Sequence, residues 1–190
     1  MRKIVCALSL TSALVFALAV HAAAPASFAG TWTLDKAKSQ GLSQRMQGAE
    51  SVSWVISQTD KDITIEEKVT GGQMGGGPGG GAPPAGAPPG GGGGGRGGMM
   101  GGGGPRTYNL DGSETSGDMG RAKFTRKATW ANEGKTLELV SKTTFAGQDG
   151  EVVTTTTDKL QLAADGKTLT VTRHSEGPRG PQDSTMVFNK

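Results

Sequence analysis

The sequence predicts an all-β fold, an antiparallel up-and-down barrel of about eight strands. Apolar and polar residues alternate along most of the chain, and a period of two is typical of strands with one buried and one solvated face. Short segments rich in Gly, Asp and Asn separate the alternating runs, as hairpin turns do. Closing the strands into a barrel, or a flattened one, removes the exposed edges of an open sheet.

Large apolar residues occupy the inward positions of the predicted strands. In chain order these positions are Trp32 and Leu34; Val52, Trp54 and Ile56; Ile63 and Ile65; Phe124, Ala128 and Trp130; Leu137 and Leu139; Leu160 and Leu162; Leu169 and Val171; Met186 and Phe188. Hairpin turns are predicted at residues 59–62, 132–135, 148–150 and 164–167. One helix candidate, residues 36–48, lacks an apolar stripe and could be a loop with a single helical turn.

Residues 1–22 have the layout of a secretory signal peptide. Arg2 and Lys3 precede an apolar run from Ile4 to Val20, and Val20-His21-Ala22 provides suitable small residues for cleavage. The run is slightly shorter than the roughly 20 apolar residues of a membrane-spanning helix. We therefore predict an exported protein, periplasmic or extracellular, without a membrane span after cleavage.

Residues 71–105 differ sharply in composition from the rest of the chain. They contain 21 of the 33 glycines and 6 of the 9 prolines, with no aromatic or β-branched residue. Such a segment buries too little apolar surface to offset the entropy of ordering it, so we predict a disordered insertion. A longer flexible loop costs little extra to close. Residues 23–70 and 106–190 can therefore form the two parts of one β-barrel domain.

The residue inventory excludes several chemistries. Signal cleavage would remove the only cysteine, Cys6, and with it any disulfide or thiolate site. His174 would be the one remaining histidine, so we predict no metal site, no cofactor and no enzymatic activity. The mature chain would have 18 basic and 17 acidic residues, which gives no electrostatic basis for nucleic-acid binding.

Residues 30–39, Gly-Thr-Trp-Thr-Leu-Asp-Lys-Ala-Lys-Ser, resemble the start of secreted, lipocalin-like bacterial proteins of uncharacterised function. Repeated hairpins of the Asp-Gly-Lys-Thr-Leu type extend the resemblance into the C-terminal half. Gly-x-Trp is similar to the first motif of lipocalin and calycin barrels, in which the tryptophan closes one end. The resemblance implies a lipocalin-like barrel with Trp32 as a structural residue at one end. It also implies a late arginine packed on that tryptophan, for which Arg126 and Arg173 are the candidates.

These features predict a non-catalytic binding module for a small apolar ligand. A barrel of about eight strands has room for one such molecule, and the residues predicted to line its cavity are Trp54, Tyr108, Phe124 and Trp130. The alternative is a structural or interaction protein of the cell envelope, with a filled core and the glycine-rich loop as a spacer. An envelope hydrolase would instead need His174 beside a carboxylate in a cleft. A dry cavity of several hundred Å³ would favour the binding module.

Overall fold

The computed structural model describes residues 25–71, 104–147 and 150–190. The predicted signal peptide, nearly all of the predicted insertion and two residues of the predicted turn at 148–150 lie outside these ranges. The predictions for those segments therefore stay predictions. None of the helices within the described ranges is long and apolar enough to cross a membrane.

Ten antiparallel strands form a single sheet. They are β1 Gly30–Leu34, β2 Ser51–Gln58, β3 Asp62–Thr70, β4 Arg106–Asn109, β5 Thr115–Met119, β6 Ala122–Ala131, β7 Thr136–Gly147, β8 Gly150–Leu162, β9 Thr168–Glu176 and β10 Gln182–Asn189. The predicted number of about eight was too low. The additional strands β4 and β5 have four and five residues, too few to show a clear alternation of apolar and polar positions.

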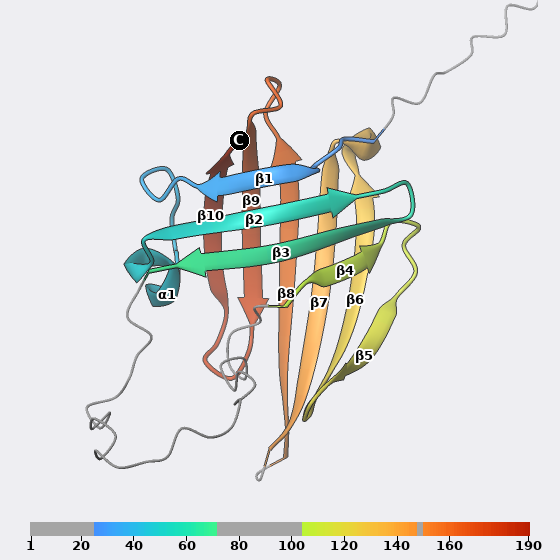
Figure 1. Cartoon of the computed structure of the whole chain (residues 1–190). Coiled ribbons are helices and arrows are strands. Elements are labelled where there is room, and N and C mark those ends of the chain that lie inside the picture. The colour runs from blue at the N-terminus through green and yellow to red at the C-terminus, as the bar shows by residue number, and fades with distance from the viewer. Residues whose placement is uncertain (1–24, 72–103, 148–149) are drawn as a thin grey trace, which may run out of the picture.

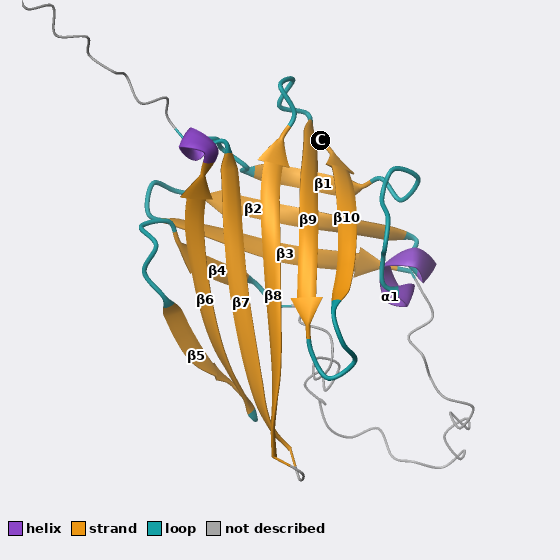
Figure 2. Ribbon diagram, turned by 180° about the vertical axis from the view of Figure 1, so that it is seen from behind, coloured by secondary structure: helices purple, strands orange, loops and turns teal. Residues whose placement is uncertain are grey.

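The sheet order follows the chain order almost completely. It runs β4-β3-β2-β1-β10-β9-β8-β7-β6-β5, so β1 pairs with β10 and every strand pairs with its chain neighbour except β4 with β5. Strands β1–β4 form one layer that runs across the layer of β6–β10 (Figure 1). Strand β4 lies against β5 and β6 without joining them in a ladder. The fold is therefore an up-and-down barrel that is nearly closed, as Figure 2 shows from behind.

The apolar core fills the space between the two layers. Trp32 and Phe28 are fully buried there, and Nε1 of Trp32 donates a 2.8 Å hydrogen bond to the carbonyl oxygen of Phe28. Trp54 packs on Phe188 with ring centroids 4.9 Å apart. The remaining large side chains of the core that are fully buried are Tyr108, Ile63, Ile65, Leu137, Leu139, Leu160, Leu169 and Met186.

The cation that packs on Trp32 is a lysine. Nζ of Lys190 lies 4.8 Å from the centroid of the Trp32 ring, so neither Arg126 nor Arg173 takes the position that the resemblance implied for an arginine. The pairing of β1 with β10 explains this, because it brings the residue after β10 beside β1. Arg126 and Arg173 lie on β6 and β9 and contact other aromatic rings.

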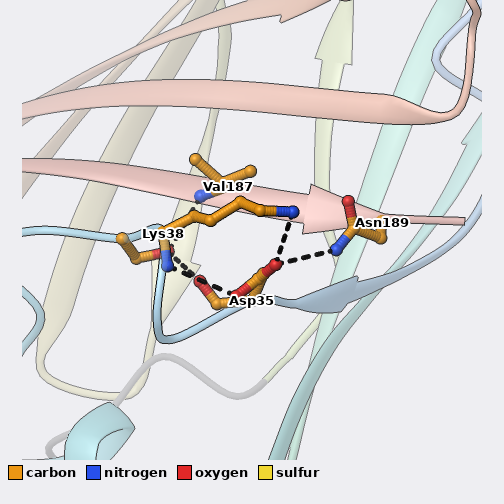
Figure 3. Close-up of polar contacts among 5 residues, drawn as sticks. Asp35, Lys38, Val187 and Asn189 are labelled. Atoms are coloured by element: carbon orange, nitrogen blue, oxygen red, sulfur yellow. Dashed lines mark hydrogen bonds and ion pairs between the residues drawn. The ribbon is translucent and has the colours of Figure 1, made fainter.

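A turn after β1 holds β1 against β10 (Figure 3). Oδ2 of Asp35 pairs with Nζ of Lys38 at 3.0 Å and accepts a 3.2 Å hydrogen bond from Nδ2 of Asn189. Oγ of Ser39 donates to the Asp35 carbonyl oxygen at 2.7 Å and accepts from the backbone N–H of Val187 at 2.9 Å. The Asp-Lys-Ala-Lys-Ser sequence therefore fastens β1, the first strand in the chain, to β10, the last.

The helix candidate at 36–48 forms only one short helix, α1 Gln44–Gly48. Ser43 is its N-cap and accepts a hydrogen bond from the backbone N–H of Met46. The preceding residues are not helical, because residues 36–38 form a turn and Gln40 forms a β-bridge with Thr185 of β10. A second short element, the 3₁₀ helix η1 Asn132–Gly134, occupies the predicted turn between β6 and β7.

Candidate functional site

The inward face of β6–β9 changes from apolar to polar along its length. On β9 the buried residues Leu169 and Val171 are followed on the same face by Arg173 and Ser175. On β8 Leu160 is buried, and the next inward residue in the direction of the β7–β8 turn is Asp158. The polar half of these strands extends beyond the β1–β4 layer (Figure 1), so the opposing layer covers only the apolar half.

Three arginines and one aspartate gather where the core gives way to this polar half. We call Arg106 of β4, Arg126 of β6, Arg173 of β9 and Asp158 of β8 the arginine cluster. Arg106 and Arg173 both face the Trp54 ring, with guanidinium carbons 5.6 and 5.7 Å from its centroid. The cluster thus draws its members from both layers, and two of its arginines face one tryptophan.

Arg173 and Asp158 form a bidentate ion pair. They are opposite each other on β9 and β8, with Nε–Oδ1 at 2.6 Å and Nη2–Oδ2 at 2.9 Å. Burial opposes the positive charge of Arg173, but the attraction and hydrogen bonds of Asp158 outweigh it, so the pKa of Arg173 is raised. Both oxygens of the Asp158 carboxylate therefore accept hydrogen bonds from Arg173.

Arg126 is buried against aromatic rings. It is 9% exposed, and its guanidinium carbon lies 4.1 Å from the centroid of Phe124 and 6.0 Å from that of Tyr108. Burial lowers the pKa of Arg126, and the positive charge of Arg106 acts in the same direction. The described residues provide no hydrogen-bond partner for its buried Nε.

Arg106 has the same deficit. Its Nε and Nη2 atoms are buried, and within the described ranges neither has a hydrogen-bond partner. A third unpartnered group, Oγ1 of Thr115, lies beside them, since Thr115 is directly opposite Arg126 in the β5–β6 ladder. Glu67 adds one more negative charge near the cluster, where it accepts a 3.3 Å hydrogen bond from Nε1 of Trp54. Three guanidinium groups therefore face two carboxylates.

A groove of about 700 Å³ reaches the cluster from outside. Its roof is the segment Gly41–Met46 and its floor is the inward face of β9 and β10, including Arg173, Ser175 and Ser184. Arg179, in the β9–β10 turn, lines its outer part. Arg173 belongs both to the groove and to the cluster, so the groove reaches the cluster at this arginine.

The structure brings together three of the four residues that the sequence predicted to line a cavity. Trp54, Tyr108 and Phe124 each contact an arginine of the cluster. Trp130 lies elsewhere and stacks on Phe28, with ring centroids 6.0 Å apart. None of the four charged members was predicted as a binding residue, since Arg126 and Arg173 were candidates only for packing on Trp32. The signal for Asp158 was present, because Asp158 has the same strand parity as Leu160 and Leu162.

His174 lies on the outer face of β9, away from the cluster. Its Nδ1 lies 2.6 Å from Oδ1 of Asp183, and its Nε2 lies 3.4 Å from Oε1 of Glu176. The hydrogen bond to Asp183, followed by that to Glu176, raises the pKa of His174 above the usual 6.5. Asp183, its hydrogen-bond partner, is also among the residues that line the groove. Within the described ranges, no three His, Cys, Asp or Glu residues are placed to hold a metal ion.

Comparison with known proteins gives little further information. No protein-family model and no curated protein matches this sequence. Among solved structures, the chain is similar to the zebrafish ileal bile acid-binding protein complexed with cholic acid. The two share 13% sequence identity with a TM-score of 0.42, over 86% of this chain and 98% of that one.

Proposed function

We propose that the protein is a non-catalytic binding module for a small amphipathic acid, whose acidic group contacts the arginine cluster. The observation that carries the proposal is the set of buried, unpartnered N–H groups on Arg106 and Arg126. A buried donor without a partner costs about 1–3 kcal/mol, and more when it is charged. A carboxylate, sulfate or phosphate group placed between these side chains would offset that cost.

The charge balance supports an anion. Asp158 is committed to Arg173, and Glu67 bonds the indole of Trp54. Arg106 and Arg126 therefore keep positive charge that no described carboxylate pairs directly. Guanidinium groups match the planar geometry of a carboxylate, and in a partly buried site this pairing is stronger than in water.

The aromatic surroundings support an apolar body on the same ligand. The core itself is filled, because Trp54 and Tyr108 are fully buried with Phe188 and the neighbouring aliphatic residues. Phe124 is half-buried beside Arg126, so it remains available to an apolar group next to the bound acid. The ligand would thus lie at the border of the core rather than inside it.

The filled core also favours the second candidate, a structural or interaction protein of the envelope. In that case the cluster would bind no small molecule. For either candidate we propose export through cleavage of residues 1–22, with the protein acting in the periplasm or outside the cell, as the signal-like N-terminus predicts.

The test compares decanoate with decanol, which have similar chains but differ in charge. Binding is followed by tryptophan fluorescence, since Trp54 contacts two members of the cluster. We expect decanoate to bind more tightly, and Arg126→Gln to weaken it by about 10- to 100-fold, the value of a hydrogen bond to a charged group.

The matched control is Lys127→Gln, which removes the same charge from the exposed, opposite face of β6. It should leave the affinity for decanoate unchanged. Circular dichroism and thermal unfolding establish that both variants are folded. Equal affinities for decanoate and decanol, or an Arg126→Gln variant that binds like wild type, would refute the proposal and leave the structural role.

A further inference from the structure

An apolar strip continues from the arginine cluster to the free tips of the long strands. Met119, Phe145 and Val152 are 50%, 41% and 39% exposed. They belong to one row across four strands, because Ala122 pairs with Met119 on β5 and with Phe145 on β7, and Phe145 pairs with Val152 on β8. We call Met119, Ala122, Phe145 and Val152 the apolar strip.

The strip and the cluster share one face of the sheet. Directly opposite residues in an antiparallel ladder point to the same side, and so do residues two apart on one strand. Ala122, Phe124 and Arg126 therefore form a line on β6 that runs from the strip to the cluster. The four residues from Arg126 to Ala122 span roughly 13 Å of strand.

Phe124 connects the two regions. Its ring lies across Gly117 of β5, where an added Cβ would come within 2.8 Å of Cζ of the ring. The guanidinium of Arg126 lies 4.1 Å from the centroid of the same ring. Glycine at position 117 thus makes room for the tip of the ring over β5, so an apolar ring lies between the arginine and the strip.

We propose that the apolar strip binds the hydrocarbon tail of the acid whose charged group lies on the arginine cluster. This inference rests on the proposed function and names the ligand class as a monoanionic, aliphatic amphiphile. Two observations select that occupant over a protein partner. The strip is a single narrow row, and Phe124 lies between it and the unpartnered cationic donors. Exposed apolar residues arranged in this way are common at binding surfaces.

The expected signature is a dependence of affinity on chain length. A tail that lies on the strip is covered on one side, so each added methylene should raise the affinity roughly twofold, half the free-energy effect of full burial. The increase should stop once the tail spans the roughly 13 Å from Arg126 to the strip and passes its end. Straight-chain carboxylates from butanoate to tetradecanoate, below their micelle concentrations, provide the series.

The chain offers an unusually close control. Val152 and Val153 are neighbours on β8 with 39% and 40% exposure, but they point to opposite faces. Val152→Ser and Phe145→Ser should reduce the affinity for decanoate several-fold while leaving butanoate unchanged. Val153→Ser should change neither. Because all three residues lie outside the buried core, at about 40% exposure, the variants should fold like wild type.

The outcomes separate the two proposals. Binding at the strip would be refuted if the affinity of the wild-type protein did not increase with the chain length of the carboxylate. It would also be refuted if the Val152→Ser and Phe145→Ser variants showed the same increase as wild type. The acid site would still stand if Arg126→Gln lost decanoate in the same experiment. Equal losses for Val152→Ser and Val153→Ser would also refute the strip, since only one of them faces it. If Arg126→Gln retains wild-type affinity, the proposed function fails first and the strip with it.

Discussion

The two halves of the inward sheet face are built from the same strands but are stabilised differently. Where the β1–β4 layer covers this face, most of its apolar residues are fully buried, including Leu137, Leu139, Leu160 and Leu169. Toward the tips of β5–β8 the layer ends, and the same face carries arginines, threonines and exposed apolar residues. The alternation of inward and outward residues is continuous across both halves, so the backbone is the same in each. The two halves differ in whether an opposing layer covers them.

Strand length explains the difference. β7 and β8 have 12 and 13 residues and therefore span about 40 Å. The layer of β1–β4 runs across them, and four strands spaced about 4.8 Å apart cover only about half of that length, so part of the inner face remains open. Side chains on this open part do not have to pack in the core. They can therefore be polar or charged, which a closed core would exclude.

The largest expected difference between the halves is in stability. Trp32→Ala, in the covered half, should lower the free energy of unfolding by about 3–5 kcal/mol, because it leaves a large cavity among fully buried residues. Phe145→Ala, in the open half, should change it by less than about 0.5 kcal/mol, as most exposed substitutions do. Denaturant unfolding measures both. Comparable losses would mean that the open half is covered in solution.

A somewhat smaller effect is expected at the border. Asp158→Asn removes the partner of Arg173 and should cost about 3 kcal/mol, because it leaves a buried guanidinium uncompensated. The same change adds positive charge to the cluster, so decanoate should raise the melting temperature of the variant more than that of wild type. A variant as stable as wild type would show that the pair is solvated. The melting-temperature shift then tests the electrostatic argument separately.

The smallest effect is expected on the outer face, at His174. Its pKa is raised in the folded protein, so the histidine stabilises the fold fully below 6.5, its usual value, and this contribution disappears as the pH rises through the raised pKa. Proton NMR titration of the His174 ring should show the raised pKa. Asp183→Asn should return it toward 6.5, since the hydrogen bond to Asp183 is the main cause. An unchanged pKa in that variant would contradict the pairing.

Much of the fold could be predicted from the sequence, for identifiable reasons. Alternation of apolar residues located eight of the strands, and turn chemistry located hairpins such as 59–62 and 164–167. β4 and β5 were missed because Arg-Thr-Tyr-Asn and Thr-Ser-Gly-Asp-Met are short and mostly polar. Their strand structure depends on neighbours that are remote in the sequence or joined by a turn, which a local pattern does not contain.

The candidate site was less predictable. Arg126 and Arg173 have inward parity, but parity does not show whether an opposing layer covers a position. The pairing of Arg173 with Asp158 depends on the register of β8 with β9, and Arg106 reaches the cluster only because β4 lies against β6. Trp130 was grouped with the other aromatic residues by parity, yet Phe28, which precedes the first strand, occupies the space beside it.

The missing ladder between β4 and β5 has a consequence for folding topology. Because β1 pairs with β10, a chain rewired to join Lys190 to the start of β1, and opened between β4 and β5, would have its strands in the same linear order as the sheet. All ladders would then be simple hairpins, and the pairing that spans the greatest sequence separation would become local. Low contact order speeds folding, so the rewired chain should fold faster than the natural one, in which β1 must find β10 across the whole length of the domain.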